Sequence, residues 1–87
     1  MIRIKIVGCV KEPGYKSLPD DSSLKDAINI AKGFATKPYP HTGIISIRNL
    51  RKSDGKGYLR RRININKINP SSVMLRNNDF IVAQYNA

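Results

Sequence analysis

The chain has 87 residues, of which 40% are hydrophobic, and its 16 basic and 6 acidic residues give a formal net charge of +10. A chain this short folds as one domain with a thin hydrophobic core, which leaves no space for an enzyme scaffold with a deep cleft. A single cysteine excludes an intrachain disulfide framework, and no apolar run approaches the about 20 residues of a membrane-spanning helix. We therefore expect a single domain over residues 1–87 that is not an enzyme.

The first 18 residues predict a hairpin of two strands. The stretch Ile2–Ile6 alternates isoleucine with basic residues, and this period of two is typical of a strand that buries one face. Pro13 and Gly14 are turn residues. Residues 15–18 are then the second strand of the same hairpin.

A short helix is predicted to follow this hairpin. Ser23 is the expected N-cap, and Asp26, three residues later, completes a capping box with Asp in place of Glu. One apolar stripe at helical spacing is formed by Leu24, Ala27, Ile28 and Ala31. Gly33 stands where a left-handed residue ends a helix. A helix of about nine residues is too short to be stable alone, so it is expected to pack on the sheet.

The second half of the chain predicts three further strands, at residues 44–48, 58–66 and 79–85, after a loop over residues 35–43. Gly55 and Gly57 mark a turn between the first two of these strands. The predicted order is therefore β-β-α-β-β-β. This order favours an α+β fold of the β-grasp type, in which one helix packs on one face of a mixed sheet of four or five strands.

Most of the positive charge lies in residues 48–62, which we call the basic hairpin. It contains one acidic residue, Asp54, and seven basic residues, which are Arg48, Arg51, Lys52, Lys56, Arg60, Arg61 and Arg62. In the predicted strand Arg60 and Arg62 share a face with Tyr58, whereas Arg61 points to the other face. One interpretation is a solvated edge that prevents sheets from pairing. The other is an anion site that binds phosphate, acidic sugar or lipid headgroups, with Tyr58 stacking on a base or sugar ring.

Two further candidates lie in the loop after the helix. Tyr39 and His41 are residue types that contact glycans, although ordinary loop surface is the alternative. His41 has no Cys, His or Asp partner at ligand spacing, so no metal site is expected. The sequence has no nucleophile with a base at recognisable spacing and no phosphate loop, so no catalytic residue and no cofactor are expected. Asp79, at a turn before the last strand, is expected to accept hydrogen bonds from backbone amides.

The ordered motifs of the chain resemble those of soluble-ligand-binding β-grasp (SLBB) domains. The resemblance rests on Val7-Gly8-Cys9-Val10 with the following Pro13-Gly14, on Ser23-Leu24-Lys25-Asp26-Ala27-Ile28 with Ala31-Lys32-Gly33, on Ile45-Ser46-Ile47-Arg48, and on Leu75 to Ala83. The chain departs from the family pattern at Lys32 and Asn78, where the family has glycine, and at Ala83, where it has valine. Asparagine tolerates the left-handed conformation, so the turn at Asn78 is expected to persist.

The resemblance implies a binding module without catalysis, of the kind found in bacterial polysaccharide export proteins, whose ligand is a soluble compound, a glycan or a protein. One alternative is a small basic protein that binds nucleic acid through the basic hairpin. Another is a scaffold that pairs with a protein partner through its sheet edge. The first residues lack the apolar segment of a secretory signal. A cytoplasmic location is therefore expected if the chain is complete, and the periplasm or envelope if it is one domain of an exported protein.

Overall fold

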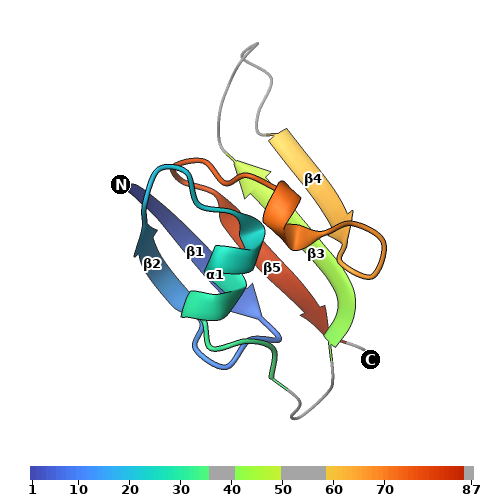
Figure 1. Cartoon of the computed structure of the whole chain (residues 1–87). Helices are drawn as coiled ribbons and strands as arrows, with labels where there is room; N and C mark the ends of the chain where they lie inside the picture. The colour runs from blue at the N-terminus through green and yellow to red at the C-terminus, as the bar shows by residue number, and fades with distance from the viewer. Residues whose placement is uncertain (36–40, 50–58, 86–87) are drawn as a thin grey trace.

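A computed structural model describes residues 1–35, 41–49 and 59–85. Its elements along the chain are β1 (Ile2–Gly8), β2 (Gly14–Leu18), α1 (Leu24–Ile30), β3 (His41–Asn49), β4 (Leu59–Asn64), the 3-10 helix η1 (Pro70–Ser72) and β5 (Phe80–Tyr85). The predicted α+β class, with one α-helix on a mixed sheet, is confirmed (Figure 1). The short helix η1 was not predicted from the sequence.

The sheet has five strands in the order β2-β1-β5-β3-β4. The first and last strands of the chain, β1 and β5, are parallel neighbours at its centre, and every other pair is antiparallel. The hairpins β1–β2 and β3–β4 therefore flank β5 on its two sides. This arrangement brings residues from both ends of the chain onto one surface.

The hydrophobic core lies between one face of the sheet and α1, which crosses that face together with η1 (Figure 1). The isoleucines that alternate along β1 point into this core, as predicted, and Ile4 and Ile6 are fully buried there. From the other strands the core receives Ile45, Ile47 and Ile81, and α1 contributes Leu24, Ala27 and Ile28. Among the described residues no helix covers the opposite face of the sheet, which we call the uncovered face (Figure 1).

The helix begins as its sequence predicts and ends earlier. The capping box is confirmed, since the Asp26 amide donates to the Ser23 hydroxyl at 3.3 Å and the Ser23 amide donates to the Asp26 carboxylate at 2.8 Å. The C-cap is Ala31, and Lys32 already has a φ of +66°, one residue before Gly33 at +84°. A left-handed lysine is unusual, because its Cβ crowds the following carbonyl oxygen.

Several strand boundaries of the second half differ from the prediction, and β4, for example, ends at Asn64 and not at the predicted Asn66. The strand β3 begins at His41, which pairs with Tyr85 of β5, so it starts three residues before the predicted Ile44. The register shifts between His41 and Ile45, where Gly43 has a φ of +84°. Within the described residues, no helix is long and apolar enough to cross a membrane.

Candidate functional site

The uncovered face of the sheet carries one side chain from each of the five strands in a continuous row. Tyr15 of β2 lies opposite Lys5 of β1, which in turn lies opposite Phe80 of β5. Phe80 also lies opposite Arg48 of β3, and Arg48 lies opposite Arg60 of β4. Side chains of directly opposed residues project from the same face of a sheet. This cross-strand row therefore crosses the whole sheet with two aromatic rings and three cations.

Two more basic side chains lie on the same face. Arg3 is two residues before Lys5 on β1, and Arg62 is two residues after Arg60 on β4, where it lies opposite Ser46. Because side chains alternate along a strand, residues two apart share a face. We call the five cations Arg3, Lys5, Arg48, Arg60 and Arg62 the basic face.

Four of the five acidic residues in the described part of the chain lie away from the basic face. Asp20, Asp21 and Asp26 are exposed in or just before α1, on the other side of the sheet, and Glu12 lies in the β1–β2 turn. Asp79 is only 1% exposed and is engaged within the protein. Asp79 is therefore the one acidic residue of the described part of the chain that lies near the basic face, where it lines the same groove as Arg3, Lys5 and Arg48, and its carboxylate is already engaged within the protein.

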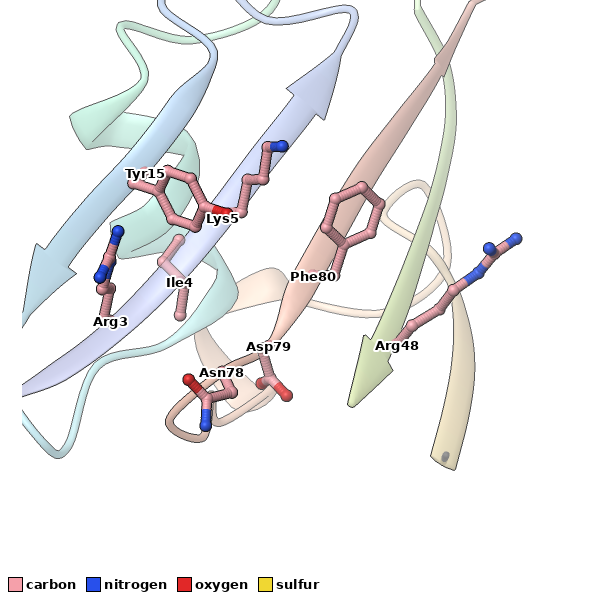
Figure 2. A pocket seen from close by; sticks show the side chains of 8 residues that line it. All are labelled: Arg3, Ile4, Lys5, Tyr15, Arg48, Asn78, Asp79 and Phe80. Carbon is pink, nitrogen blue, oxygen red and sulfur yellow. The ribbon is translucent and has the colours of Figure 1, made fainter. Parts of the chain in front are cut away.

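A groove of about 550 Å³ lies on this face at β1, β2, β5 and β3 (Figure 2). This volume falls within the range of about 300–1,000 Å³ that is typical of small-ligand sites. The groove is lined by Arg3, Ile4, Lys5, Tyr15, Arg48, Asn78, Asp79 and Phe80. Side chains from both ends of the chain thus form its walls.

Cations lie against both aromatic rings of the groove. The guanidinium carbon of Arg3 is 4.3 Å from the centre of the Tyr15 ring. The Lys5 ammonium nitrogen is 5.1 Å from the centre of the Tyr15 ring and 5.8 Å from that of Phe80. Such cation–π contacts restrain the flexible basic side chains. Tyr15 is nevertheless 61% exposed, so a planar group of a ligand can reach the ring and the guanidinium beside it.

Arg48 and Arg60 are like charges placed directly opposite each other on β3 and β4. Like charges directly opposite each other destabilise a sheet. The Nε atom of Arg48 is also buried without a hydrogen-bond partner among the described residues. A bound anion would relieve the repulsion between the two guanidinium groups.

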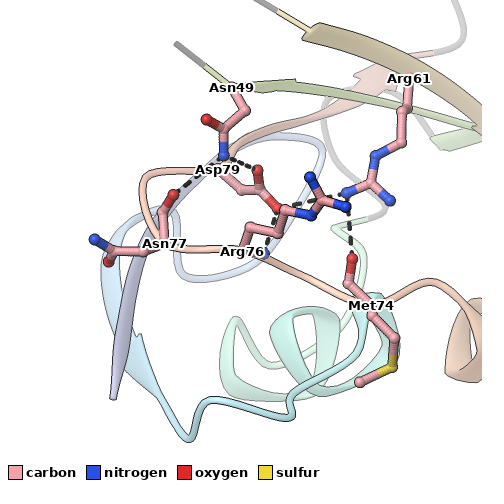
Figure 3. A network of polar contacts seen from close by, with 6 residues as sticks. All are labelled: Asn49, Arg61, Met74, Arg76, Asn77 and Asp79. Atoms are coloured by element: carbon pink, nitrogen blue, oxygen red, sulfur yellow. Dashed lines mark hydrogen bonds and ion pairs between the residues drawn. The ribbon is translucent and has the colours of Figure 1, made fainter. Parts of the chain in front are cut away.

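Arg61 lies on the opposite side of β4 from Arg60 and Arg62, as the alternation of the strand predicted, and its partners are within the protein (Figure 3). Its Nη2 donates to the carbonyl oxygen of Met74 at 3.2 Å and is 3.5 Å from the Asp79 carboxylate. The structure therefore separates Arg61 from Arg48, Arg60 and Arg62 and gives it a role in the fold.

Asp79 joins this network to the neighbouring turn (Figure 3). One carboxylate oxygen accepts a hydrogen bond from the side-chain amide of Asn49, and the other accepts one from the Arg76 backbone amide at 2.8 Å. The Asn49 amide also donates to the Asn77 carbonyl oxygen at 3.1 Å. The prediction that Asp79 accepts from a backbone amide is confirmed.

The remaining predicted site residues are Tyr39, His41, Arg51, Lys52, Lys56 and Tyr58. Five of them lie outside the described residues: Tyr39, Arg51, Lys52, Lys56 and Tyr58. His41 was predicted to lie in a loop, and this placement is wrong, because the backbone of His41 pairs with Tyr85 as the first residue of β3. The pairing with β5 extends β3 beyond the residues whose own pattern indicates a strand.

Sequence reasoning missed the contribution of the N-terminal hairpin and β5 to this site. The alternation in β1 already placed Arg3 and Lys5 on the solvent side, but it did not indicate that they lie near Arg48. No family model and no curated protein matches the chain. Within residues 1–35, 41–49 and 59–85, no group of three or more His, Cys, Asp or Glu residues is placed to hold a metal ion.

Proposed function

We propose that the chain is a non-catalytic β-grasp binding module, similar to SLBB domains, that holds a negatively charged ligand on its basic face. Its strand order, with the terminal strands β1 and β5 parallel at the centre and one helix on one face, supports the β-grasp proposal. The motifs that resemble SLBB domains support the proposal of a binding function. The ligand recognised by such a surface carries several negative charges, such as phosphate groups or the carboxylates of an acidic glycan.

The observation that carries this proposal is the position of the cations on interior strands. Charges that only prevent aggregation are needed at the edges of a sheet, where backbone groups are unpaired. Lys5 and Arg48 lie instead on β1 and β3, each of which has a strand on both sides. Arg48 is in addition opposed to Arg60 at a cost in stability. Both features fit a surface maintained for an anionic ligand better than one that serves solubility alone.

Matched charge reversals test this proposal. The double variant Arg60→Glu with Arg62→Glu changes two exposed residues of the basic face, and the control Lys25→Glu with Lys32→Glu changes two exposed lysines in or next to α1. Each variant lowers the net charge of +10 by 4, because each exchange replaces one positive charge by one negative charge. The ligand probe is short-chain inorganic polyphosphate, and binding is measured by isothermal titration calorimetry at about 50 mM salt.

The basic-face variant is expected to lose at least about 10-fold in affinity, since one charge-assisted hydrogen bond contributes about 1.5–3 kcal/mol. The control is expected to change affinity less than about 3-fold, because its charges lie across the sheet and are screened over about 10 Å. The basic-face variant should also unfold no more easily than the original protein, because the carboxylate introduced by Arg60→Glu would face Arg48 with opposite charge. Equal losses in both variants, or no binding by the original protein, would show that the basic face is not a binding site.

A further inference from the structure

We propose that the ligand of the basic face is single-stranded nucleic acid, with bases stacked at the Tyr15 end of the cross-strand row and phosphates held at the Arg60 end. This inference rests on the proposed function and names its class of ligand. It follows from the unequal chemistry of the two ends of the row. Within the cross-strand row, aromatic rings lie on β2 and β5, whereas the described residues that β3 and β4 contribute to the row, Arg48 and Arg60, carry guanidinium groups.

The aromatic end of the row offers two surfaces on which bases can stack. Tyr15 is an exposed ring on a sheet surface, and the Arg3 guanidinium lies 4.3 Å from its centre. Both tyrosine rings and arginine planes are surfaces on which unpaired bases stack. Phe80 lies two strands away from Tyr15, which corresponds to about 10 Å at the usual spacing between strands. The two rings are thus far enough apart to contact separate bases of one strand.

The cationic end of the row offers guanidinium groups to phosphates. Arg48 and Arg60 continue the row, and Arg62 lies beside it on β4. The five strands of the row span about 19 Å, which is the length of roughly five or six nucleotides of a stacked strand. A ligand that reaches across the face therefore meets the two rings with its bases and at least three guanidinium groups with its phosphates.

The chemistry of the aromatic end favours a single strand over other polyanions. A duplex hides the faces of its bases, so it would contact the arginines and leave Tyr15 unused. An acidic glycan stacks the C–H face of a sugar on an aromatic ring, whereas here the Arg3 guanidinium, 4.3 Å from the centre of the exposed Tyr15 ring, adds a second planar surface. A guanidinium plane is suited to a flat base. The cation-capped ring therefore favours a nucleic-acid strand over a sugar chain.

The experiment measures fluorescence anisotropy of labelled oligouridylate and oligothymidylate, with a mixed-sequence DNA duplex and polygalacturonate as competitors. Single strands are expected to bind and to weaken about 20-fold between 50 and 200 mM salt if three phosphates are neutralised. Tyr15→Ala and Tyr15→Leu should each lose about 5-fold or more, whereas Tyr15→Phe should stay within about 2-fold. Tyr15 is exposed on an edge strand, and circular dichroism melting checks that each variant remains folded.

The inference is wrong if Tyr15→Leu binds single strands as tightly as the original protein, because stacking would then contribute nothing. It is equally wrong if the duplex or polygalacturonate competes more strongly than an unlabelled single strand of equal charge. In either case, polyphosphate binding that is lost with Arg60→Glu and Arg62→Glu would leave the proposed anion-binding function intact. Failure of polyphosphate and single strands alike to bind would overturn both proposals.

Discussion

Replacing Asp79 by asparagine is expected to destabilise the protein nearly as much as replacing it by alanine. Both carboxylate oxygens accept hydrogen bonds, one from the Asn49 side chain and the other from the Arg76 amide at 2.8 Å. An asparagine has one acceptor oxygen and one donor group. In either orientation its NH2 group would therefore meet another donor. The shape of the side chain would be preserved while one of its two contacts became repulsive.

The size of the expected loss in stability follows from the burial of the Asp79 side chain. The Asp79 side chain is only 1% exposed, so donors left without their acceptor stay away from water. Each charge-assisted hydrogen bond contributes about 1.5–3 kcal/mol. We expect Asp79→Ala to lower the free energy of unfolding by about 3–4 kcal/mol, and Asp79→Asn to lower it by about 2–3 kcal/mol. For a domain of this size, a loss of about 2–3 kcal/mol corresponds to a fall in Tm of roughly 10–20 °C.

The assay is thermal and urea unfolding followed by far-ultraviolet circular dichroism. Asp20→Asn is the matched control, because it makes the same chemical change at a side chain that is 73% exposed and paired only with the N-terminal ammonium group among the described residues. That control should change stability by less than about 0.5 kcal/mol. If Asp79→Asn stays within about 0.5 kcal/mol of the original protein, one carboxylate oxygen is dispensable and the reasoning from two acceptors is wrong.

Two backbone predictions concern residues in the left-handed region. Gly8→Ala should lower the free energy of unfolding, measured with urea, by more than about 3 kcal/mol. Gly8 has a φ of +93°, and an added Cβ would overlap the carbonyl oxygen of Ala83. A Gly8→Ala protein as stable as the original would contradict this packing. Lys32→Gly should raise the free energy of unfolding by about 0.5–1 kcal/mol and move the urea midpoint to a higher concentration. Glycine relieves the strain of a lysine at a φ of +66°, and this gain is larger than the cost of the greater freedom of glycine in the unfolded chain. An unchanged or lower midpoint would show that Lys32 is not strained.

The elements that the sequence predicted well depend on contacts within a few residues. Strand β1 follows from the alternation of its isoleucines, and the start of α1 follows from the reciprocal capping of Ser23 and Asp26. The end of α1 was less predictable. Lys32 enters the left-handed region before Gly33, and the Lys11 and Glu12 amides bond to carbonyl oxygens of this segment, Gly33 and Ala31, at 3.1 and 2.9 Å. Tertiary contacts at the β1–β2 turn thus accompany a conformation that lysine does not favour by itself.

The candidate site was only partly visible in the sequence. Counting charges identified the basic hairpin, and strand alternation separated Arg61 from its two neighbours. The same alternation put Arg3 and Lys5 in solvent, but charge density gave no reason to join them to Arg48. That connection depends on β5, whose parallel pairing with β1 and antiparallel pairing with β3 places one hairpin on each of its two sides.

The amino-acid sequence alone determined the class of fold and the excess of positive charge, because these depend on composition and on the local period of apolar residues. The tertiary structure alone decided which cations share a surface, which one bonds within the protein, and that Tyr15 and Phe80 lie among them. The physical reason is that strand pairing between distant segments is selected by burial of the common core. The uncovered face receives whatever side chains that pairing brings together.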